Sequence, residues 1–274
     1  MNTKALTLPQ RPEKSRDHGW TVLIDNGVPL HHFEDIIESH HQLIDIIKFG
    51  WGTSVISSTL NAKISCLQSH QVDYFFGGTL FEKFYVQGKT KDYRAYCLDY
   101  GCKYVEISNG TIPMPNTEKA RFVNLFAKDF QVLSEVGFKD QEKSLGLTTK
   151  RWIEAIQEDL RFGATKVILE ARESGTSGIC LNDGSMRMDV LEAILATDID
   201  HNHLIFEAPN KDMQTNLIEL VGANVNLANI SFADVIALET LRLGLRSDTL
   251  MLFEEEEENS YARRQHGVPF SHSS

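Results

Sequence analysis

The chain has 274 residues, of which 42% are hydrophobic, and its formal net charge is -11. This length suits one domain with a sizeable core, and the acidic balance argues against a nucleic-acid-binding protein, which needs clustered lysine and arginine. No segment approaches the ~20 apolar residues of a membrane-spanning helix, and the first residues lack the apolar stretch of a secretory signal. The four cysteines show no CxxC spacing, so we expect free thiols and a cytoplasmic protein.

Residues 1–20 are predicted to form a polar arm that leads into a first strand. From there, apolar runs alternate with helical patterns, and most runs close on a charged or amide residue before a turn. The closing positions are Asp25, Lys48, residues 77–79, Glu106, Glu135, Glu170, Glu207 and Asn226. Most intervals hold one crossover helix and one parallel strand, so the sequence predicts an α/β fold, a single (β/α)8 TIM barrel over residues 21–253.

Local signals mark the ends of several helices. Gly101 and Gly163 are expected to end two of them, and Thr148 or Thr149 is expected to cap the helix between the fifth and sixth strands. Residues 254–274, an acidic run followed by a polar segment, are predicted to be a disordered tail.

Four glutamates close predicted strands, at Glu106, Glu135, Glu170 and Glu207. In a barrel, the carboxyl ends of the strands meet at the rim that carries catalysis. Buried carboxylates need a cation, and Mg²⁺ prefers oxygen ligands. The sequence therefore predicts a Mg²⁺ site on this rim. The alternative is a network of ion pairs with nearby lysines and arginines.

Cationic and small residues on the same rim suit anionic substrates. Lys48 could neutralise a phosphate, transfer a proton or form a Schiff base, or could simply pair with a strand-end acid. Gly78 and Thr79 offer backbone N–H groups to an oxyanion. Arg172 and Ser174, in the segment EARESGTSG, could hold a carboxylate or phosphate.

Two later loops add candidates for substrate binding. Lys211 lies in EAPNKDMQ, and Asn226 and Asn229 lie in VNLANI, near the loops where barrels often hold phosphate. The alternative for the two asparagines is that they cap the last helix.

The succession of motifs resembles one known family. KFGWGTS, GGTLFE, EISNG, EVGFKD, EARESGTSG, FEAPNKDMQ, VNLANI and LETLRLGLRSDT occur in that order between about Lys14 and Thr249, as in the phosphosulfolactate synthase family, to which plant heat-stress-associated proteins are related. The resemblance implies a Mg²⁺-dependent barrel enzyme, a homo-oligomer, that adds sulfite to phosphoenolpyruvate and forms 2-phospho-3-sulfolactate. It also implies that Lys139 donates the proton, with Lys48 as the second choice.

Two other functions remain open from the sequence. A barrel that acts in stress protection through protein contacts is suggested by the acidic tail and by departures from the family pattern, EKSR at residues 13–16 and Asn109 in EISNG. A Schiff-base aldolase would use Lys48, but such a lysine needs a lowered pKa, which neighbouring carboxylates oppose.

Overall fold

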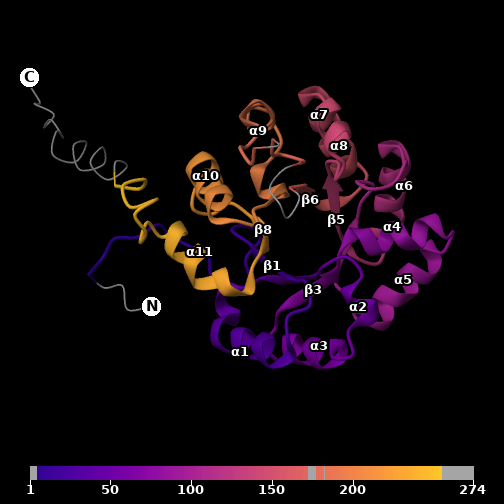
Figure 1. The fold of residues 1–274 in the computed structure, drawn as a ribbon, viewed down its shortest axis with the longest axis horizontal. Helices are drawn as coiled ribbons and strands as arrows, with labels where there is room; N and C mark the ends of the chain where they lie inside the picture. The colour runs from indigo at the N-terminus through magenta and orange to yellow at the C-terminus, as the bar shows by residue number, and fades with distance from the viewer. Residues whose placement is uncertain (1–4, 172–176, 182, 255–274) are drawn as a thin grey trace, which may run out of the picture.

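The computed structural model describes residues 5–171, 177–181 and 183–254, and it shows eight parallel strands in one sheet that curls into a nearly closed barrel (Figure 1). The hydrogen-bonded order is β3-β2-β1-β8-β7-β6-β5-β4, and the terminal strands β3 and β4 contact each other. The strands are β1 (Thr21–Asp25), β2 (Ile46–Phe49), β3 (Asp73–Phe76), β4 (Tyr104–Ile107), β5 (Gln131–Val136), β6 (Ala164–Leu169), β7 (Leu204–Glu207) and β8 (Leu227–Ile230). The predicted (β/α)8 barrel is confirmed.

Helices surround the barrel and connect its strands (Figure 1). They are α1 (Leu30–His40), α2 (Thr53–Ile56), α3 (Leu60–Ser69), α4 (Gly78–Val86), α5 (Thr90–Asp99), α6 (Asn116–Phe126), α7 (Gln141–Gly146), α8 (Thr149–Arg161), α9 (Met188–Leu195), α10 (Lys211–Val221) and α11 (Val235–Arg242), with short 3₁₀ turns η1 (His41–Leu43), η2 (His201–His203) and η3 (Phe232–Asp234). Thr148 caps α8 by accepting a hydrogen bond from the Arg151 N–H, and Gly101 and Gly163 follow α5 and α8 with positive φ, as expected.

The alternation of side chains along the strands separates two environments. One face of each strand packs against the helices in the larger core. A second apolar cluster consists of Trp20, Val22, Ile46, Phe75, Tyr104, Leu133, Ile168, Ile205 and Ala228. Because side chains alternate with a period of two, the residues two positions beyond several of these members share the same interior face. Those residues include Lys48 and all four predicted glutamates, so the strands themselves place the charges above the apolar layer.

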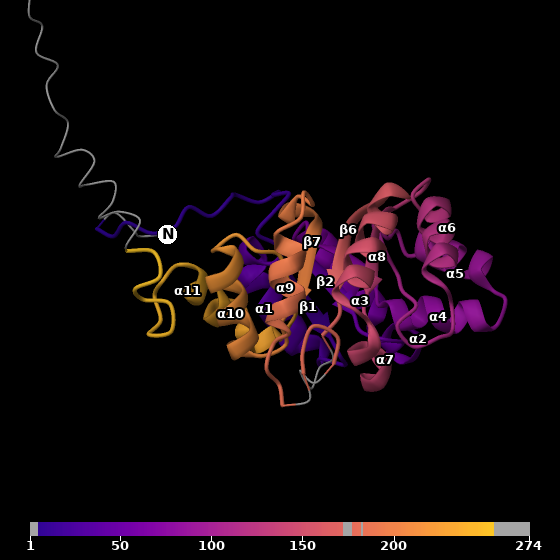
Figure 2. The ribbon, with the colours of Figure 1, turned by 90° about the horizontal axis from the view of Figure 1, so that it is seen from above.

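Residues 5–20 pack against the end of the barrel opposite to α7 (Figure 2). Arg11 forms an ion pair with Glu239 of α11 at 3.1 Å, and Arg16 pairs with Asp45 at 2.9 Å. These contacts hold the arm at the amino ends of the strands, away from the predicted catalytic rim.

Candidate active site

A cavity of about 490 Å³ lies at the carboxyl ends of the strands. Eight of the predicted site residues line it: Lys48, Gly78, Thr79, Glu106, Lys139, Glu170, Glu207 and Asn229. The other lining residues are Ile24, Trp51, Gly77, Thr111, Asp140 and Ala171. Barrel enzymes carry their active sites at this rim, so the cavity is the candidate active site.

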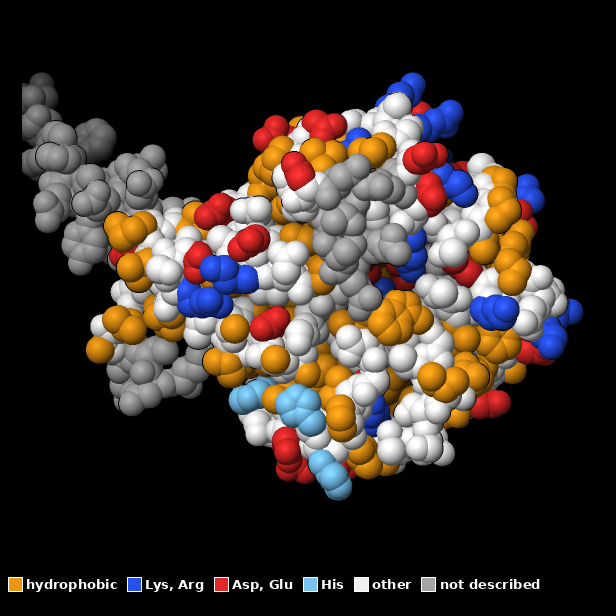
Figure 3. All heavy atoms as spheres, in the orientation of Figure 1, with side chains coloured by type: hydrophobic (Ala, Val, Ile, Leu, Met, Phe, Trp, Pro, Cys, Tyr) orange, Lys and Arg blue, Asp and Glu red, His pale blue; other side chains and the backbone are white. Residues whose placement is uncertain are grey.

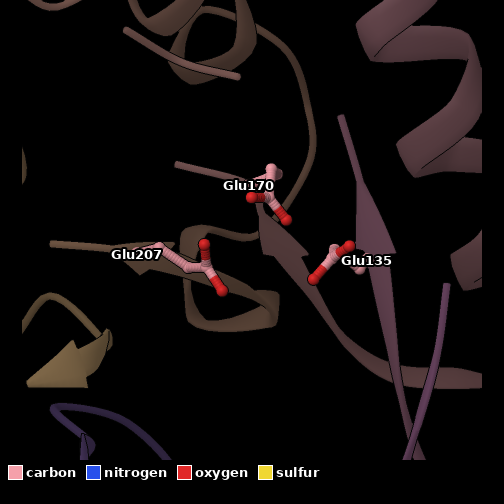
Figure 4. A group of neighbouring side chains, drawn as sticks. All are labelled: Glu135, Glu170 and Glu207. Carbon is pink, nitrogen blue, oxygen red and sulfur yellow. The ribbon is translucent and has the colours of Figure 1, made fainter. Parts of the chain in front are cut away.

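Three glutamates from neighbouring strands converge beside this cavity (Figure 4). Glu135 lies near the end of β5, Glu170 directly follows β6, and Glu207 ends β7. One carboxylate oxygen from each lies within 4.8 Å of the others, and each residue is at most 2% exposed. Glu106, at 0% exposure, approaches the cluster from β4. We call these four residues the glutamate cluster.

Lys48 occupies the centre of the glutamate cluster. Its Nζ lies 3.0 Å from Glu207 Oε1, 3.1 Å from Glu106 Oε2 and 3.9 Å from Glu135 Oε2. Burial acts to lower the pKa of Lys48, but the surrounding carboxylates outweigh it and raise this pKa well above its ordinary value. Lys48 is therefore a fixed cation, which disfavours its use as a Schiff-base nucleophile.

Lys139 reaches the cluster from the loop after β5. Its Nζ donates a hydrogen bond to Thr79 Oγ1 at 3.1 Å and lies 3.8 Å from both Glu135 Oε1 and Glu170 Oε2. Burial opposes the charged form, but Glu135 and then Glu170 raise the pKa of Lys139. The side chain is 28% exposed, so this protonated amine stands at the mouth of the cavity, whereas Lys48 lies within it.

The four carboxylates of the cluster exceed the two lysines in charge. Burial, with the nearby Glu135, raises the pKa of Glu106 to about 8, and burial also raises the pKa of Glu170 well above its usual range. Burial opposes ionisation of Glu135 too, but Lys139 and Lys48 lower its pKa to about 2. With only Lys48 and Lys139 as cations, protonation of Glu106 and Glu170 removes the negative charge that the two lysines do not balance.

Several buried oxygens of the cluster accept no hydrogen bond from the described residues: both oxygens of Glu106, both oxygens of Glu135, and Oε2 of Glu170. Four of them lie within 4.0 Å of the Nζ of Lys48 or Lys139, and Glu106 Oε1 has no such ion pair. Buried carboxylate oxygens without hydrogen bonds are costly, and a hard divalent cation is a partner that they suit. The residues present therefore fit Mg²⁺.

The structure corrects two of the substrate-binding predictions. Asn226 does not end a strand: it precedes β8, and its side chain bonds to the Trp20 N–H and to Leu204 O at the amino end of the barrel. Lys211 begins α10 on the correct rim, but its Nζ pairs with Asp248 at 2.8 Å and does not line the cavity. Arg172 and Ser174 lie outside the described residues.

Asn229, a predicted substrate-binding candidate, lines the cavity, whereas Trp51 and Glu82 were not predicted. Trp51 and Asn229 have left-handed backbones, φ 48° and 58°, which non-glycine residues rarely adopt. Glu82 of α4 accepts hydrogen bonds from Ser108 Oγ at 2.7 Å and from the Thr111 N–H at 3.3 Å, directly behind the site. The position of Glu82, one helical turn after Gly78, was the sequence signal for its orientation toward the strands.

Comparison with known proteins identifies the family. Residues 9–248 match the family described as (2R)-phospho-3-sulfolactate synthase (ComA). The chain belongs to this family. The phosphosulfolactate synthase of Bacillus subtilis is 54% identical over 252 residues, which cover 92% of this chain and all of that protein. The phosphosulfolactate synthase of Methanocaldococcus jannaschii is 41% identical over 84% of this chain and 93% of its own.

Solved structures of other families share the architecture of this phosphosulfolactate synthase family member. 3-Hexulose-6-phosphate synthase from Salmonella typhimurium superposes with a TM-score of 0.53 at 11% identity, over 82% of this chain and 99% of its own. 3-Keto-L-gulonate-6-phosphate decarboxylase from Vibrio cholerae gives a TM-score of 0.53 at 10% identity, over 86% and 99%. At these identities the likeness concerns the barrel fold alone.

The surface shows acidic and basic side chains interspersed over the face seen in Figure 3. Within the described part of the chain, no helix is both long and apolar enough to cross a membrane.

Proposed function

We propose that the chain catalyses the addition of sulfite to phosphoenolpyruvate, which forms 2-phospho-3-sulfolactate, with Mg²⁺ as the cofactor. The observation that carries the proposal is the buried glutamate cluster with its two lysines, in a chain that aligns with phosphosulfolactate synthases over most of its length. The net charge of the protein alone would repel small anionic substrates, but the lysines at the mouth and centre of the acidic cavity attract them.

Glu135, Glu170 and Glu207 are the residues that would hold the metal, and Glu106 adjoins them. When bound, Mg²⁺ supplies electrostatic stabilisation of the negative charge that develops on the substrate carboxylate. Lys48 orients the cluster through its contacts with Glu207 and Glu106, and it contributes a fixed positive charge at the base of the site.

The reaction requires one bond to carbon and one proton. The sulfur lone pair of sulfite forms the bond to C3, the π electrons of the C2–C3 double bond move toward C2 and the carboxylate, and C2 then takes a proton. We assign that proton to Lys139 Nζ, which Thr79, Glu135 and Glu170 hold at the cavity. Because its pKa is raised, Lys139 carries the proton at neutral pH, and its exposed fraction allows water to restore it.

We also infer a cytoplasmic homo-oligomer. The four cysteines are all free thiols, which suits a reducing compartment. Val55 and Ile56 on α2 are 63% and 85% exposed, and such apolar side chains suit a contact between subunits.

The proposal is tested with the purified chain, phosphoenolpyruvate, sulfite and Mg²⁺, with mass spectrometry of the products. We expect phosphosulfolactate only in the complete mixture, and none when sulfite is omitted or Mg²⁺ is removed by a chelator. Failure to form the product across metals and pH would reject the proposal. A variant truncated after residue 254 should keep full turnover, because the described lining residues of the cavity all precede residue 230.

A further inference from the structure

Trp51 is an exposed aromatic residue in the lining of the candidate active site. Its side chain is 39% exposed, whereas the other two tryptophans, Trp20 and Trp152, are 5% and 0% exposed. Tryptophan is mostly buried in proteins, because its ring is a large apolar surface. A ring that is left open at the wall of a cavity offers that surface to whatever the cavity binds.

The backbone at Trp51 is strained. The Thr53 N–H donates a hydrogen bond to Gly50 O at 3.0 Å, which closes a tight turn after β2. Trp51 is the first of the two central residues of this turn and has φ 48°, as in turns of type II′, where glycine is the usual residue. A bulky residue with positive φ is an outlier, and strain of this kind is typical of ligand-contacting positions. Glycine would relieve the strain, so the turn by itself does not account for a tryptophan.

The order of the strands places Trp51 across the cavity from Glu170. Trp51 follows β2 and Glu170 follows β6, and three strands, β1, β8 and β7, lie between them in the sheet. In a barrel of eight strands, this separation puts the two strand ends on opposite sides of the rim. Lys139 follows β5 and also lies on the side of Glu170, at 3.8 Å from it. The cavity therefore has an aromatic residue on one side and charged groups on the other.

The shape of phosphoenolpyruvate suits such a cavity. Its C2–C3 double bond is conjugated with the carboxylate, so the reacting part of the molecule is planar. One face of that plane can lie against the Trp51 ring, while the other face is left open to Lys139 and to sulfite. The indole N–H of Trp51 is a hydrogen-bond donor and suits a phosphate or carboxylate oxygen of the same molecule. Sulfite is a compact anion without a planar apolar part, and it gains little from an aromatic surface.

We propose that Trp51 is a substrate-binding residue that contacts phosphoenolpyruvate, with its ring on one face of the planar substrate and its indole N–H donating to an anionic oxygen. This inference rests on the proposed function. It assigns to Trp51 a role in the binding of phosphoenolpyruvate and none in the binding of sulfite. The exposed Val55 and Ile56 of α2 follow closely in sequence but do not line the cavity, so they have no part in this contact.

Tryptophan fluorescence tests the contact without turnover. Because Trp20 and Trp152 are buried, quenching by acrylamide reports mainly on Trp51. Phosphoenolpyruvate with Mg²⁺, in the absence of sulfite, should lower the Stern–Volmer constant about twofold or more, because a bound ligand is largely enclosed by its pocket. Sulfite alone should leave the constant unchanged. Trp51→Phe retains only the two buried tryptophans and should show little quenching with or without phosphoenolpyruvate, which verifies the origin of the signal.

Two substitutions at Trp51 test the contact in steady-state kinetics. Trp51→Phe keeps a ring and removes the N–H donor, and it should raise KM for phosphoenolpyruvate about 10-fold. Trp51→Gly keeps the left-handed backbone and removes the ring, and it should raise this KM about 100-fold or more. KM for sulfite should stay within about twofold in both variants. Ile56→Ala is the matched control, because Ile56 is 85% exposed outside the cavity lining, and it should change neither KM.

The two experiments separate this inference from the proposed function. Protection of Trp51 by phosphoenolpyruvate in a chain that forms no product supports the contact and rejects only the proposed function. A wild type that forms product without such protection, with a Trp51→Gly variant that keeps its KM for phosphoenolpyruvate, overturns the contact. An increase confined to KM for sulfite also overturns it. Protection that follows protein concentration in place of phosphoenolpyruvate overturns it as well, because it assigns Trp51 to a contact between subunits.

Discussion

Replacement of Gly78 by alanine should disturb the glutamate cluster from behind. A Cβ at this position would overlap Ser108 Oγ and would lie only 2.7 Å from Glu106 Oε1 and 2.7 Å from Ser108 Cβ. Real Cβ atoms essentially never approach other heavy atoms below 3.0 Å, so at least one of these side chains must move. Ser108 cannot rotate away freely, because its Oγ donates a hydrogen bond to Glu82 at 2.7 Å.

The size of the effect follows from what must move. Overpacking of a close-packed site costs about 1–3 kcal/mol, and loss of the hydrogen bond from Ser108 to the Glu82 carboxylate adds about 1–3 kcal/mol. We therefore expect Gly78→Ala to lower the free energy of unfolding by about 2–6 kcal/mol, which lowers Tm by roughly 4–24 °C for a domain of this size. If Glu106 moves instead, displacement of about 1 Å at the cluster should lower kcat by up to about 100-fold.

The assay combines thermal unfolding with product formation at saturating substrates. Gly146→Ala is the matched control, because among the described residues nothing lies within 4 Å of a Cβ added to this exposed glycine of α7. The control should match the wild type in Tm and kcat. A Gly78→Ala variant with a Tm within about 1 °C of the wild type and unchanged kcat would refute the reasoning.

Further predictions concern the lysines and pH. Lys139→Ala should lower kcat about 100-fold or more with little change in KM, whereas Lys48→Ala should raise KM for phosphoenolpyruvate. Lys211→Ala is the control and should resemble the wild type, because the Lys211 amine pairs with Asp248 outside the cavity. A raised KM in Lys139→Ala together with a lowered kcat in Lys48→Ala would reverse the two roles. The pKa of Glu106 is raised to about 8, so the folded state favours the protonated form of this carboxyl. The metal-free protein should therefore lose stability as pH increases from about 5 to 8. Thermal unfolding at several pH values tests this, and a Tm that increases over that interval would contradict it. The pKa of Glu135 is lowered to about 2, so the stability that it contributes should be complete above about pH 5 and should be lost progressively as pH decreases from about 5 to 2.

The barrel and the glutamate cluster could be predicted from the sequence for the same physical reason. In a parallel barrel a strand reads as an apolar run, and a charged residue at its end is directed to the rim that all strands share. Glu106, Glu135, Glu170 and Glu207 came together because each lies at or directly after the carboxyl end of its strand. The same rule predicted the position of Lys48 on this rim, at the end of the second strand.

The failures have local causes. In VNLANI two asparagines lie three residues apart, and the apolar pattern does not decide which of them precedes the strand; the structure places Asn226 before β8 and Asn229 within it. Lys211 begins a helix, and its partner Asp248 lies 37 residues away, so no local pattern revealed the pair. The left-handed backbone of Asn229 also had no distinct signal, because asparagine adopts both this conformation and ordinary cap positions.

The central claim is that carbon–sulfur bond formation takes place at the glutamate cluster, and product formation in D₂O by the wild type and by Glu170→Gln tests it most directly. The wild type should give phosphosulfolactate with one deuterium at C2, and Glu170→Gln should be slower by about 100-fold or more. Glu192→Gln, on the exposed face of α9, serves as the control and should match the wild type. A Glu170→Gln variant as fast as the wild type, or a wild type that yields no product, would contradict the account.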